Sequence, residues 1–301
     1  MTCEPVTCAW IAVDWGTSNL RAWAMDAQGA VVAEGTSPDG MAGLKPEEFE
    51  GRLLSVVGGW LGDGITPVLA CGMVGARQGW AEAPYAAVPC APHGAAVRVA
   101  TTDPRLAMHI LPGLKQRDPP DVMRGEETQI AGFMARHPDF AGALCLPGTH
   151  SKWAGIGGGT VAGFHTVMTG ELFALLAKSS VLRHSVAEGR DEGGGFEAAV
   201  AEALAAPESL PARLFAIRAA DLLTGASRAD AHARLSGLLI GAELAAMRAQ
   251  WSGGPVALVG AARLTALYAR ALAVEGITAT VADGTACTLS GLCAAYAEIA
   301  P

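Results

Sequence analysis

The sequence predicts an α/β fold divided into two domains of related architecture, and three observations support this prediction. The chain has 301 residues, a length that commonly holds about two domains. An apolar strand, a turn rich in Gly and Thr, and a second strand occur over residues 10–34, and the same order recurs over residues 142–165. Most of the remaining chain has the apolar spacing that favours helices. We therefore expect a duplicated strand–turn–strand unit, one copy in each domain.

The first half of the chain predicts an antiparallel meander, a helix and a buried strand. Residues 10–13, 20–25 and 30–34 are apolar or alternating runs between turns, which is typical of strands. Pro46 and the acidic residues after it begin a helix that reaches about Trp60. A buried strand follows at 66–71. Residues 81–122 are rich in Pro and are expected to be irregular, with short strands near 96–100 and 109–111.

The second half of the chain is predicted to be mainly helical. A helix begins at Gly125 and reaches Arg136, just before the second strand–turn–strand unit. One buried strand, at 256–259, interrupts the helices that follow. The expected helices cover residues 171–181, 196–205, 211–223, 227–249, 262–275 and 286–299.

Composition and charge exclude several classes of protein. Apolar residues make up 51% of the chain and charged residues only 17%, which excludes a disordered chain. The net charge of −8 argues against nucleic acid as the main partner. The seven Cys are irregularly spaced with no CxxC, so neither a disulfide framework nor a zinc site is expected. Because we find no signal peptide and no apolar run of transmembrane length, we expect a soluble, cytoplasmic protein.

The first motif with chemical meaning follows the first strand. Asp14 lies at the strand end and can hold Mg²⁺ through waters. Gly16 lets the backbone approach a phosphate, and Thr17 and Ser18 offer hydroxyl and N–H donors to its oxygens. The alternative interpretation is an ordinary hairpin turn that uses Asp, Gly and Ser for turn chemistry.

The second motif repeats this pattern after the strand at 142–146. Gly148 and Thr149 form the turn, and Ser151 and Lys152 add a hydroxyl and a cation. No acidic residue precedes this glycine, so the pattern indicates a phosphate cradle rather than a metal site. His150 is interpreted as a hydrogen-bonded turn residue.

A pair of carboxylates opens the helix before the second motif. Glu126 and Glu127 follow Gly125 directly. One interpretation is a general base that accepts a hydroxyl proton during phosphoryl transfer. The other is electrostatic, because acidic residues are favoured at a helix N-terminus by its dipole.

The strand at 256–259 runs into a turn of small residues and then a helix. Gly260, Ala261 and Arg263 lie at this junction, where small residues let an adenine and ribose lie against the backbone. The chain has no GxxxxGK[ST], which disfavours a P-loop kinase, and no GxGxxG after the first strand, which disfavours a nicotinamide dehydrogenase.

Together these segments resemble the sugar kinase/heat-shock protein 70/actin superfamily, whose members carry a phosphate-1 hairpin, a phosphate-2 hairpin and an adenosine strand–turn–helix in this order. From Trp10 to about Glu298 the chain is similar to the 2-dehydro-3-deoxygalactonokinase family. The blocks that carry this resemblance are DWGTSNLRAW, GMVGARQGW, APY, MRGEETQ, LPGTHSKW, MTGEL, LSGLLIGAE and GAARLTALY.

The resemblance implies a fold, a reaction and a domain division. The fold would be two ribonuclease-H-like (actin-like ATPase) domains, with a mixed sheet in each and an inter-domain cleft. The reaction would be phosphorylation of the 6-hydroxyl of 2-dehydro-3-deoxy-D-galactonate with ATP and Mg²⁺, in the De Ley–Doudoroff route of galactose or galactonate catabolism. Residues 1–122 would hold the phosphate-1 hairpin and the sugar-acid pocket. Residues 123–301 would hold the phosphate-2 hairpin and the adenosine site, with the last helix packing back on the N-terminal domain.

The resemblance also implies roles for the residues singled out above. Asp14 would organise the metal, and one of the two glutamates, preferably Glu127, would be the catalytic carboxylate. The first phosphate-binding set would be Gly16, Thr17 and Ser18, and the second Gly148 and Thr149 with Ser151 or Lys152 nearby. The residues near the nucleoside would be Gly260, Ala261 and Arg263.

The candidates for binding the sugar acid are inferred from its chemistry as much as from the resemblance. A sugar acid carries a carboxylate that a guanidinium can meet with two hydrogen bonds, and the candidates are Arg21, Arg124 and Arg77. Trp80 and Tyr85 are candidates to close the sugar pocket, with core packing as the alternative.

Other functions remain open from the sequence. One is a kinase of a different sugar or sugar acid on the same fold. Another is a non-catalytic regulator switched by nucleotide, against which the Glu126–Glu127 pair argues. The expected partners are ATP and a small sugar acid, with neither nucleic acid nor membrane, and a homodimer is a further expectation.

Overall fold

The computed structural model describes residues 8–186 and 195–299, which form two compact units. Unit 1 comprises the chain up to Asp139, the short segment Gly159–Gly163 and the C-terminal segment from Gly284. Unit 2 comprises Phe140–Gly158 and Phe164–Asp283. Each unit contains its own mixed sheet, with both parallel and antiparallel strand pairs, so the expected duplication of architecture is confirmed.

The units divide after Asp139, and not between residues 122 and 123 as the sequence suggested. Helix α2 (Glu126–Arg136) stays with unit 1 because it packs along the last helix, α9 (Gly284–Ile299). Gly132 of α2 lies directly against the backbone of α9, and Gly291 of α9 lies against α2, so that a Cβ at either position would overlap the other helix. Both helices therefore belong to unit 1, although α9 comes from the C-terminal end of the chain.

The main sheet of unit 1 has six strands in the order β3-β2-β1-β4-β7-β6. The pairs β1–β2, β2–β3 and β6–β7 are antiparallel, whereas β1–β4 and β4–β7 are parallel. The strands are β1 (Trp10–Trp15), β2 (Leu20–Met25), β3 (Val31–Ser37), β4 (Thr66–Cys71), β6 (Val97–Val99) and β7 (Leu106–Ile110).

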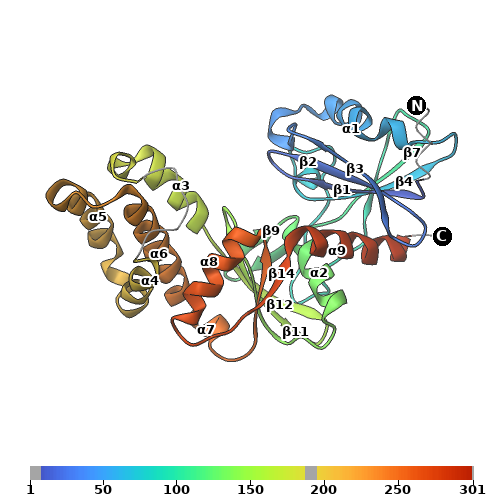
Figure 1. Ribbon diagram of the computed structural model, residues 1–301. Helices are drawn as coiled ribbons and strands as arrows, with labels where there is room; N and C mark the ends of the chain where they lie inside the picture. Colours follow the sequence, from blue (N-terminus) through green and yellow to red (C-terminus); the bar gives the residue numbers. More distant parts are fainter. Residues whose placement is uncertain (1–7, 187–194, 300–301) are drawn as a thin grey trace. The chain divides into compact units, whose positions relative to one another are not determined.

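Both faces of this sheet are covered, because alternate side chains of a strand point to opposite faces. On one face Ile11 and Val13 pack against helix α1 (Phe49–Val57). On the other face Trp10 and Ala12 belong to the cluster that includes α9, and the Trp10 ring stacks on Tyr296 of α9 at 4.2 Å. Figure 1 shows α1 and α9 on the two sides of β1. The apolar run at the start of β1 is thus explained by burial on both faces.

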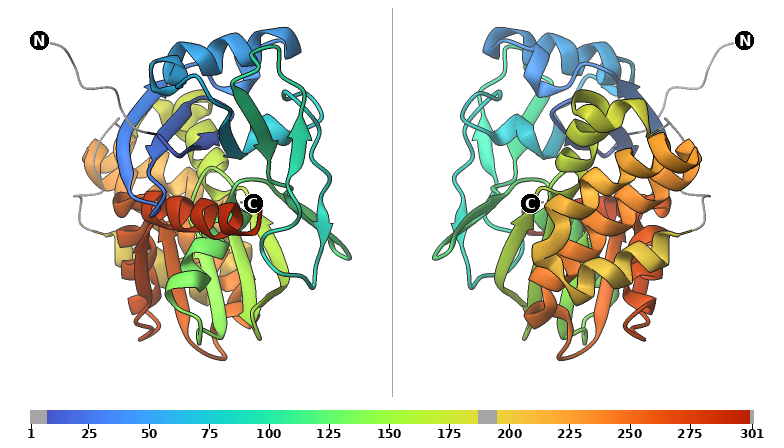
Figure 2. Two further views of the ribbon diagram at one scale, coloured as in Figure 1. Left: turned by 90° about the vertical axis from the view of Figure 1, so that its right-hand side faces the viewer. Right: turned by 90° about the vertical axis from the view of Figure 1, so that its left-hand side faces the viewer.

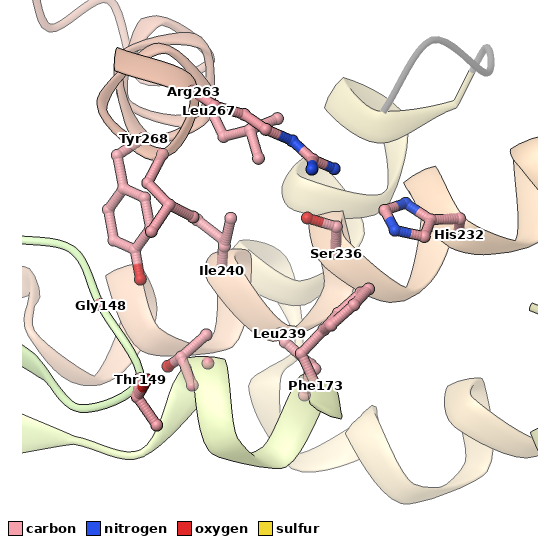
Figure 3. A pocket seen from close by; sticks show the side chains of 13 residues that line it. Gly148, Thr149, Phe173, His232, Ser236, Leu239, Ile240, Arg263, Leu267 and Tyr268 are labelled. Carbon is pink, nitrogen blue, oxygen red and sulfur yellow. The ribbon is translucent and has the colours of Figure 1, made fainter. Parts of the chain in front are cut away.

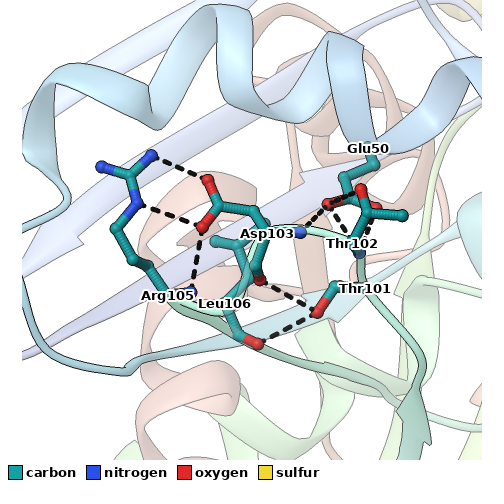
Figure 4. A network of polar contacts seen from close by, with 6 residues as sticks. All are labelled: Glu50, Thr101, Thr102, Asp103, Arg105 and Leu106. Atoms are coloured by element: carbon teal, nitrogen blue, oxygen red, sulfur yellow. Dashed lines mark hydrogen bonds and ion pairs between the residues drawn. The ribbon is translucent and has the colours of Figure 1, made fainter.

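A small sheet and a polar network complete unit 1. The sheet has the order β5-β8-β9, with bounds Ala86–Ala87, Leu114–Arg117 and Pro120–Met123. At the turn before β7, the Glu50 carboxylate of α1 accepts hydrogen bonds from the backbone N–H groups of Thr102 and Asp103, and Asp103 pairs with Arg105 (Figure 4). These contacts tie the turn to α1.

The sheet of unit 2 has five strands in the order β12-β11-β10-β13-β14. Its antiparallel β10–β11 pair and parallel β10–β13 pair repeat the pattern of β1, β2 and β4 in unit 1. The strands are β10 (Gly142–Leu146), β11 (Ser151–Gly157), β12 (Thr160–Val167), β13 (Val256–Gly260) and β14 (Thr280–Asp283).

Helices cover one face of this sheet with a single apolar core. Cys145 and Trp153 of the sheet pack with residues of α4, α6 and α8. The right-hand view of Figure 2 shows α4 to α6 (yellow to orange) side by side. The helices are α3 (Thr169–Ser179), α4 (Phe196–Ala205), α5 (Leu210–Thr224), α6 (Arg228–Ala246), α7 (Arg248–Trp251) and α8 (Ala262–Ala273).

The strands β5, β8, β9 and β14 were not expected from the sequence. β8 and β9 lie in the segment interpreted as irregular, where Pro119 and Pro120 and many polar residues hide the strand pattern. β14 is an edge strand with mostly exposed side chains, so it lacks the apolar run of a buried strand. In the part of the chain that is described, no helix is both long enough and apolar enough to cross a membrane.

Candidate active site

Backbone hydrogen bonds fix the first hairpin of unit 1, and its polar side chains are exposed to solvent. The Gly16 N–H donates to Asn19 O at 2.9 Å, and Met41 N–H donates to Gly16 O at 3.0 Å. Gly40 lies so close to the turn that a Cβ there would overlap its backbone. Thr17 and Ser18 are exposed and line a pocket of about 690 Å³. The geometry fits a loop that presents donors to an anion.

Asp14 faces the same pocket and is paired with Arg21. The two residues are register partners in β1 and β2, and Arg21 Nη2 lies 2.5 Å from Asp14 Oδ2. Arg21 Nη1 also donates to Thr285 Oγ1 at 2.9 Å. Gly72, at φ +94°, packs against this strand end, where a Cβ would meet Trp15 O at 2.7 Å and Asp14 Oδ1 at 3.4 Å. Asp14 is thus held by Arg21 at the wall of the pocket.

The glutamate pair lies close to Asp14 because β4 meets α2 through two glycines. Gly125, at φ +104°, packs on the backbone of Gly72, with 3.3 Å between its Cβ position and the Gly72 Cα. A positive φ of this size favours glycine, since other residues are strained there. Cys71 directly precedes Gly72, and burial raises the pKa of its thiol. The Asp14 and Glu127 carboxylates raise the pKa of this thiol further. Both carboxylates therefore lie around Cys71.

The two glutamates have different environments. Glu127 is 1% exposed, and its two oxygens accept the Gly125 N–H at 2.9 and 2.7 Å. Burial and the neighbouring Glu126 charge raise the pKa of Glu127 to about 8. Glu126 is half-buried, and its Oε2 accepts the Arg124 N–H at 3.1 Å. Only Glu126 presents appreciable surface.

Arg124 is a buried cation beside this pair. It is 7% exposed, its guanidinium lies 4.2 Å from the centre of the Tyr85 ring, and Nη2 donates to Ala83 O at 2.7 Å. Its Nε and Nη1 are buried without a hydrogen-bond partner. Gly75 makes room for the side chain, because a Cβ there would lie 2.8 Å from Nη1. Buried donors of a charged group are rarely left unpaired, so this guanidinium is suited to an anion.

Arg77 and Trp80 lie elsewhere in unit 1. The Arg77 side chain is 81% exposed and its Nε is 3.9 Å from Glu82. Trp80 packs among Trp15 and Phe49, with its ring stacked on the Phe49 ring at 6.2 Å. The core-packing alternative for Trp80 is the arrangement the structure has.

The second hairpin, in unit 2, is held by the first turn of α3. The Glu171 N–H donates to Thr149 O at 3.0 Å, and His150 Nε2 lies 2.6 Å from Glu171 Oε2. Gly170 is in contact with the loop, where a Cβ would overlap Gly148 O. His150 is therefore a hydrogen-bonded turn residue, as interpreted from the sequence.

Ser151 and Lys152 are both buried at the start of β11. Ser151 Oγ lies 2.8 Å from the Tyr268 hydroxyl. Thr149 is exposed and Gly148 is half-buried. The loop thus presents Gly148 and Thr149 at its surface, while Ser151 and Lys152 lie in the interior of unit 2.

A pocket of about 370 Å³ opens beside Gly148 and Thr149 (Figure 3). Arg263, Leu267 and Tyr268 reach it from α8. The full lining is Gly148, Thr149, Thr169, Gly170, Phe173, His232, Ser236, Leu239, Ile240, Arg263, Leu264, Leu267 and Tyr268. Mostly apolar walls with a few polar groups are typical of small-molecule sites.

Of the three residues expected near the nucleoside, only Arg263 lines this pocket. Gly260 lines a second pocket of about 300 Å³ with Asp283. Ala261 is exposed and precedes the first residue of α8. The structure therefore brings Gly148, Thr149 and Arg263 together.

The sequence interpretation missed the α6 wall of the pocket. His232, Ser236 and Ile240 lie on this wall with a spacing of four residues, which places them on one helix face. The block LSGLLIGAE contained two of them, and its two polar residues within an apolar helix were the available signal. The MTGEL block likewise contained Thr169 and Gly170.

No group of three or more His, Cys, Asp or Glu that could hold a metal occurs in residues 8–186 and 195–299. A single carboxylate still fits Mg²⁺, which usually keeps several waters and binds one or two carboxylates plus substrate phosphates. Asp14, a carboxylate that lines the pocket together with Thr17 and Ser18, meets that description.

Comparison with known proteins identifies close relatives over nearly the whole chain. The family model described as 2-keto-3-deoxy-galactonokinase matches residues 14–295. A protein of Rhizobium meliloti (strain 1021), named as a probable 2-dehydro-3-deoxygalactonokinase, is 42% identical over 96% of this chain and 97% of its own length. The 2-dehydro-3-deoxygalactonokinase of Escherichia coli (strain K12) is 34% identical over 95% of this chain and 97% of its own.

Solved structures give the same picture of the fold. A crystal structure from Sinorhizobium meliloti, titled with the same enzyme name, has a TM-score of 0.88 and 40% identity over 97% of this chain and 99% of its own. Component A of the Acidaminococcus fermentans (R)-2-hydroxyglutaryl-CoA dehydratase shares only 12% identity, with a TM-score of 0.54 over 98% of this chain and 100% of its own. The expected α/β fold is confirmed by these matches and by the two mixed sheets.

Proposed function

Because this chain belongs to the 2-keto-3-deoxy-galactonokinase family, we propose that it transfers the γ-phosphoryl group of ATP to the 6-hydroxyl of 2-dehydro-3-deoxy-D-galactonate. Its activity is that of a 2-dehydro-3-deoxygalactonokinase, a phosphotransferase with an alcohol group as acceptor. The observation that carries the mechanism is the meeting of Asp14, Glu126 and Arg124 around Gly72 and Gly125 in unit 1.

The nucleotide occupies the pocket of unit 2. Its apolar walls suit an adenine, and Gly148 and Thr149 lie at the rim where donors can meet phosphate oxygens. Arg263 is a cation on the same wall. Ser151 and Lys152 support the loop from within β11, and Gly260 and Ala261 shape the turn before α8.

The phosphate-1 hairpin of unit 1 supplies the second set of donors. Gly16, Thr17 and Ser18 offer backbone N–H groups and hydroxyls for the β- and γ-phosphates. Asp14 would hold Mg²⁺, while Arg21 fixes its Oδ2. Bound Mg²⁺ neutralises phosphate charge during transfer. Arg21 is thus better suited to orienting Asp14 than to binding the substrate carboxylate.

The acceptor hydroxyl attacks the γ-phosphorus, the bond from this phosphorus to the β,γ-bridging oxygen breaks, and the hydroxyl proton passes to a carboxylate. A general base must come within hydrogen-bond reach of that proton. Half-buried Glu126 meets this requirement better than Glu127, which is almost fully buried. The geometry therefore favours Glu126 as the base and Glu127 as its neighbour that closes the first turn of α2, the reverse of the preference from sequence.

Arg124 is the cation best placed for the substrate carboxylate. Its unpartnered Nε and Nη1 need an acceptor, and it lies within one residue of the Gly125–Glu126 turn. Tyr85 holds the guanidinium from one face. Arg77 is surface-exposed and Trp80 lies in the core of unit 1, so both contribute less to this proposal.

We also propose a setting for this enzyme. The enzyme acts on small molecules in the cytoplasm, with no nucleic-acid or membrane partner, and its reaction is a step of galactonate degradation. The acidic charge of −8 and the free cysteines of the described chain support a reducing, non-nucleic-acid setting. A homodimer is compatible with these features.

The test is an ADP-release assay with 2-dehydro-3-deoxy-D-galactonate, its epimer at one hydroxyl, and the analogue whose carboxyl group is reduced to an alcohol. We expect Mg²⁺-dependent turnover that is fastest with the galactonate derivative. Equal turnover of the acid and the carboxyl-reduced analogue would contradict carboxylate recognition and indicate a general sugar kinase.

A further inference from the structure

Five side chains of unit 2 meet in one buried polar network centred on Glu243. Glu243 lies in α6 and is only 2% exposed. Its Oε1 accepts from Trp153 Nε1 at 2.7 Å, and its Oε2 accepts from the Tyr268 hydroxyl at 2.7 Å. The Thr169 and Ser151 side chains also hydrogen-bond to it. One carboxylate of α6 therefore accepts hydrogen bonds from donors of β11, α3 and α8.

The same elements form the walls of the pocket beside Gly148. Thr169 of α3 and Tyr268 of α8 both line the pocket and bond to Glu243. Ser151, which follows the Gly148–Thr149 turn, bonds to the Tyr268 hydroxyl at 2.8 Å. Figure 3 shows the Tyr268 hydroxyl pointing from α8 toward that turn. A shift of Glu243 would therefore be transmitted to three sides of the pocket.

The chemistry of the network requires an acceptor at its centre. An indole N–H can only donate, and an ionised carboxylate is an acceptor with two oxygens. Burial raises the pKa of Glu243, while the hydrogen bonds from its neighbours lower it. A buried carboxyl group is costly unless its hydrogen bonds are satisfied, and once satisfied such a network specifies one arrangement of the elements around it.

We propose that Glu243 is a positioning residue for nucleotide binding, which holds Thr169, Tyr268 and, through Ser151, the Gly148–Thr149 turn in the arrangement that accepts ATP. This role rests on the proposed binding of ATP in the unit 2 pocket. Glu243 touches neither ATP nor the sugar acid in this proposal; it acts through Thr169 and Tyr268.

The test measures the dissociation constant of ATP by calorimetry, well below the unfolding temperature. Glu243→Gln and Tyr268→Phe each remove a charge-assisted hydrogen bond of the network, so we expect ATP to bind about tenfold more weakly. Gln can keep its oxygen on Trp153, so this variant should fold. The KM for the sugar acid should stay unchanged, because the carboxylate pair and Arg124 lie in unit 1.

A matched pair of tryptophans separates positioning from simple stability. Trp153 and Trp251 are both buried in the core of unit 2, and both donate an indole hydrogen bond, to Glu243 and to Leu244 O respectively. Trp153→Phe should weaken ATP binding, whereas Trp251→Phe should lower the melting temperature and leave the dissociation constant unchanged.

Each outcome decides a different question. Equal dissociation constants for the wild-type protein, Glu243→Gln and Tyr268→Phe would overturn the role of Glu243 and leave the proposed function intact. Equal weakening by Trp153→Phe and Trp251→Phe would also overturn it, since any loss of core packing would then suffice. Absence of ATP binding to the wild-type protein would instead overturn the proposed function, and this inference with it.

Discussion

The two pockets of the candidate site differ in chemistry although the two sheets repeat the same strand pattern. The unit 1 pocket is lined by the polar residues of the first hairpin, with Asp14 and Arg21 in contact. The unit 2 pocket is lined mainly by apolar side chains from three helices. The comparison teaches that a duplicated strand–turn–strand unit does not duplicate the chemistry beside it: in the proposed function, unit 1 would supply the charged groups for reaction and unit 2 the apolar surface for the nucleotide.

The strongest test of this division is the loss of the base in unit 1. Glu126→Gln keeps the size of the side chain and removes its ability to accept a proton. We expect kcat to fall by about 10²–10⁴-fold while the dissociation constant of ATP stays unchanged. Steady-state kinetics and calorimetry on the same preparation check both values. A near-normal kcat in a folded variant would remove Glu126 from the mechanism and return the role to Glu127.

The next effect concerns the carboxylate of the substrate. Arg124→Lys keeps a positive charge but loses the planar set of donors. Loss of a charge-assisted hydrogen bond should raise the KM for the sugar acid by about ten- to a hundredfold. Arg77→Lys is the matched control and should have no effect, because that side chain is exposed. If both variants behave alike, Arg124 does not bind the acid.

A smaller effect is expected from the loop of unit 2. Gly170→Ala would place a Cβ in the space occupied by Gly148 O, so the loop must shift. Overpacking of this kind costs about 1–3 kcal/mol, and we expect the KM for ATP to rise about tenfold at constant KM for the sugar acid. Gly51→Ala, where a Cβ meets nothing within 4 Å, is the control. A rise in the sugar-acid KM alone would contradict the division between the units.

The last effect is on stability rather than on kinetics and comes from Glu127. Its folded pKa of about 8 lies above the ordinary value of 4.5, so the folded state retains a proton that the unfolded state has released. The free energy of unfolding therefore falls as pH rises from about 4.5 to about 8 and levels off above that. Glu127→Gln should lack this fall. Denaturant unfolding of both proteins from pH 5 to pH 9 measures it, and parallel curves would show that Glu127 is ionised in the folded state.

Sequence alone predicted what depends on local pattern. Asp14, Thr17 and Thr149 became candidates because each lies at or just beyond the end of an apolar strand, and the structure places Asp14 and Thr17 at one pocket and Thr149 at another. What depends on distant contacts was not predicted. The approach of Gly72 to Gly125, which brings the glutamate pair to Asp14, joins segments far apart in the chain. The wall of α6 was missed for the same reason, since only the folded structure shows which face of a buried helix meets a cavity.

The environments of the candidate cations could not be predicted from the sequence. Arg21 and Arg124 were favoured over Arg77 by their place in the sequence, and in the structure Arg21 is paired with Asp14, Arg77 is on the surface and Arg124 is buried with unpartnered donors. No periodicity distinguishes these environments, because each arginine lies in or beside a turn or a short strand. The choice among them needs the geometry of Gly75 and Tyr85, which make the space for Arg124.

The buried thiols of the two sheets offer a way to observe each unit opening on its own. Cys71 lies in β4 of unit 1 and Cys145 in β10 of unit 2, and burial raises the pKa of both thiols well above the ordinary value. A thiol that is buried and protonated does not react with a disulfide reagent until its surroundings open. With the five other cysteines of the chain replaced, the labelling rate of Cys71 reports opening of the unit 1 sheet, and that of Cys145 reports opening of the unit 2 sheet. The enzyme thus contains a native probe in each half, and addition of ATP should slow the labelling of Cys145 before it slows that of Cys71.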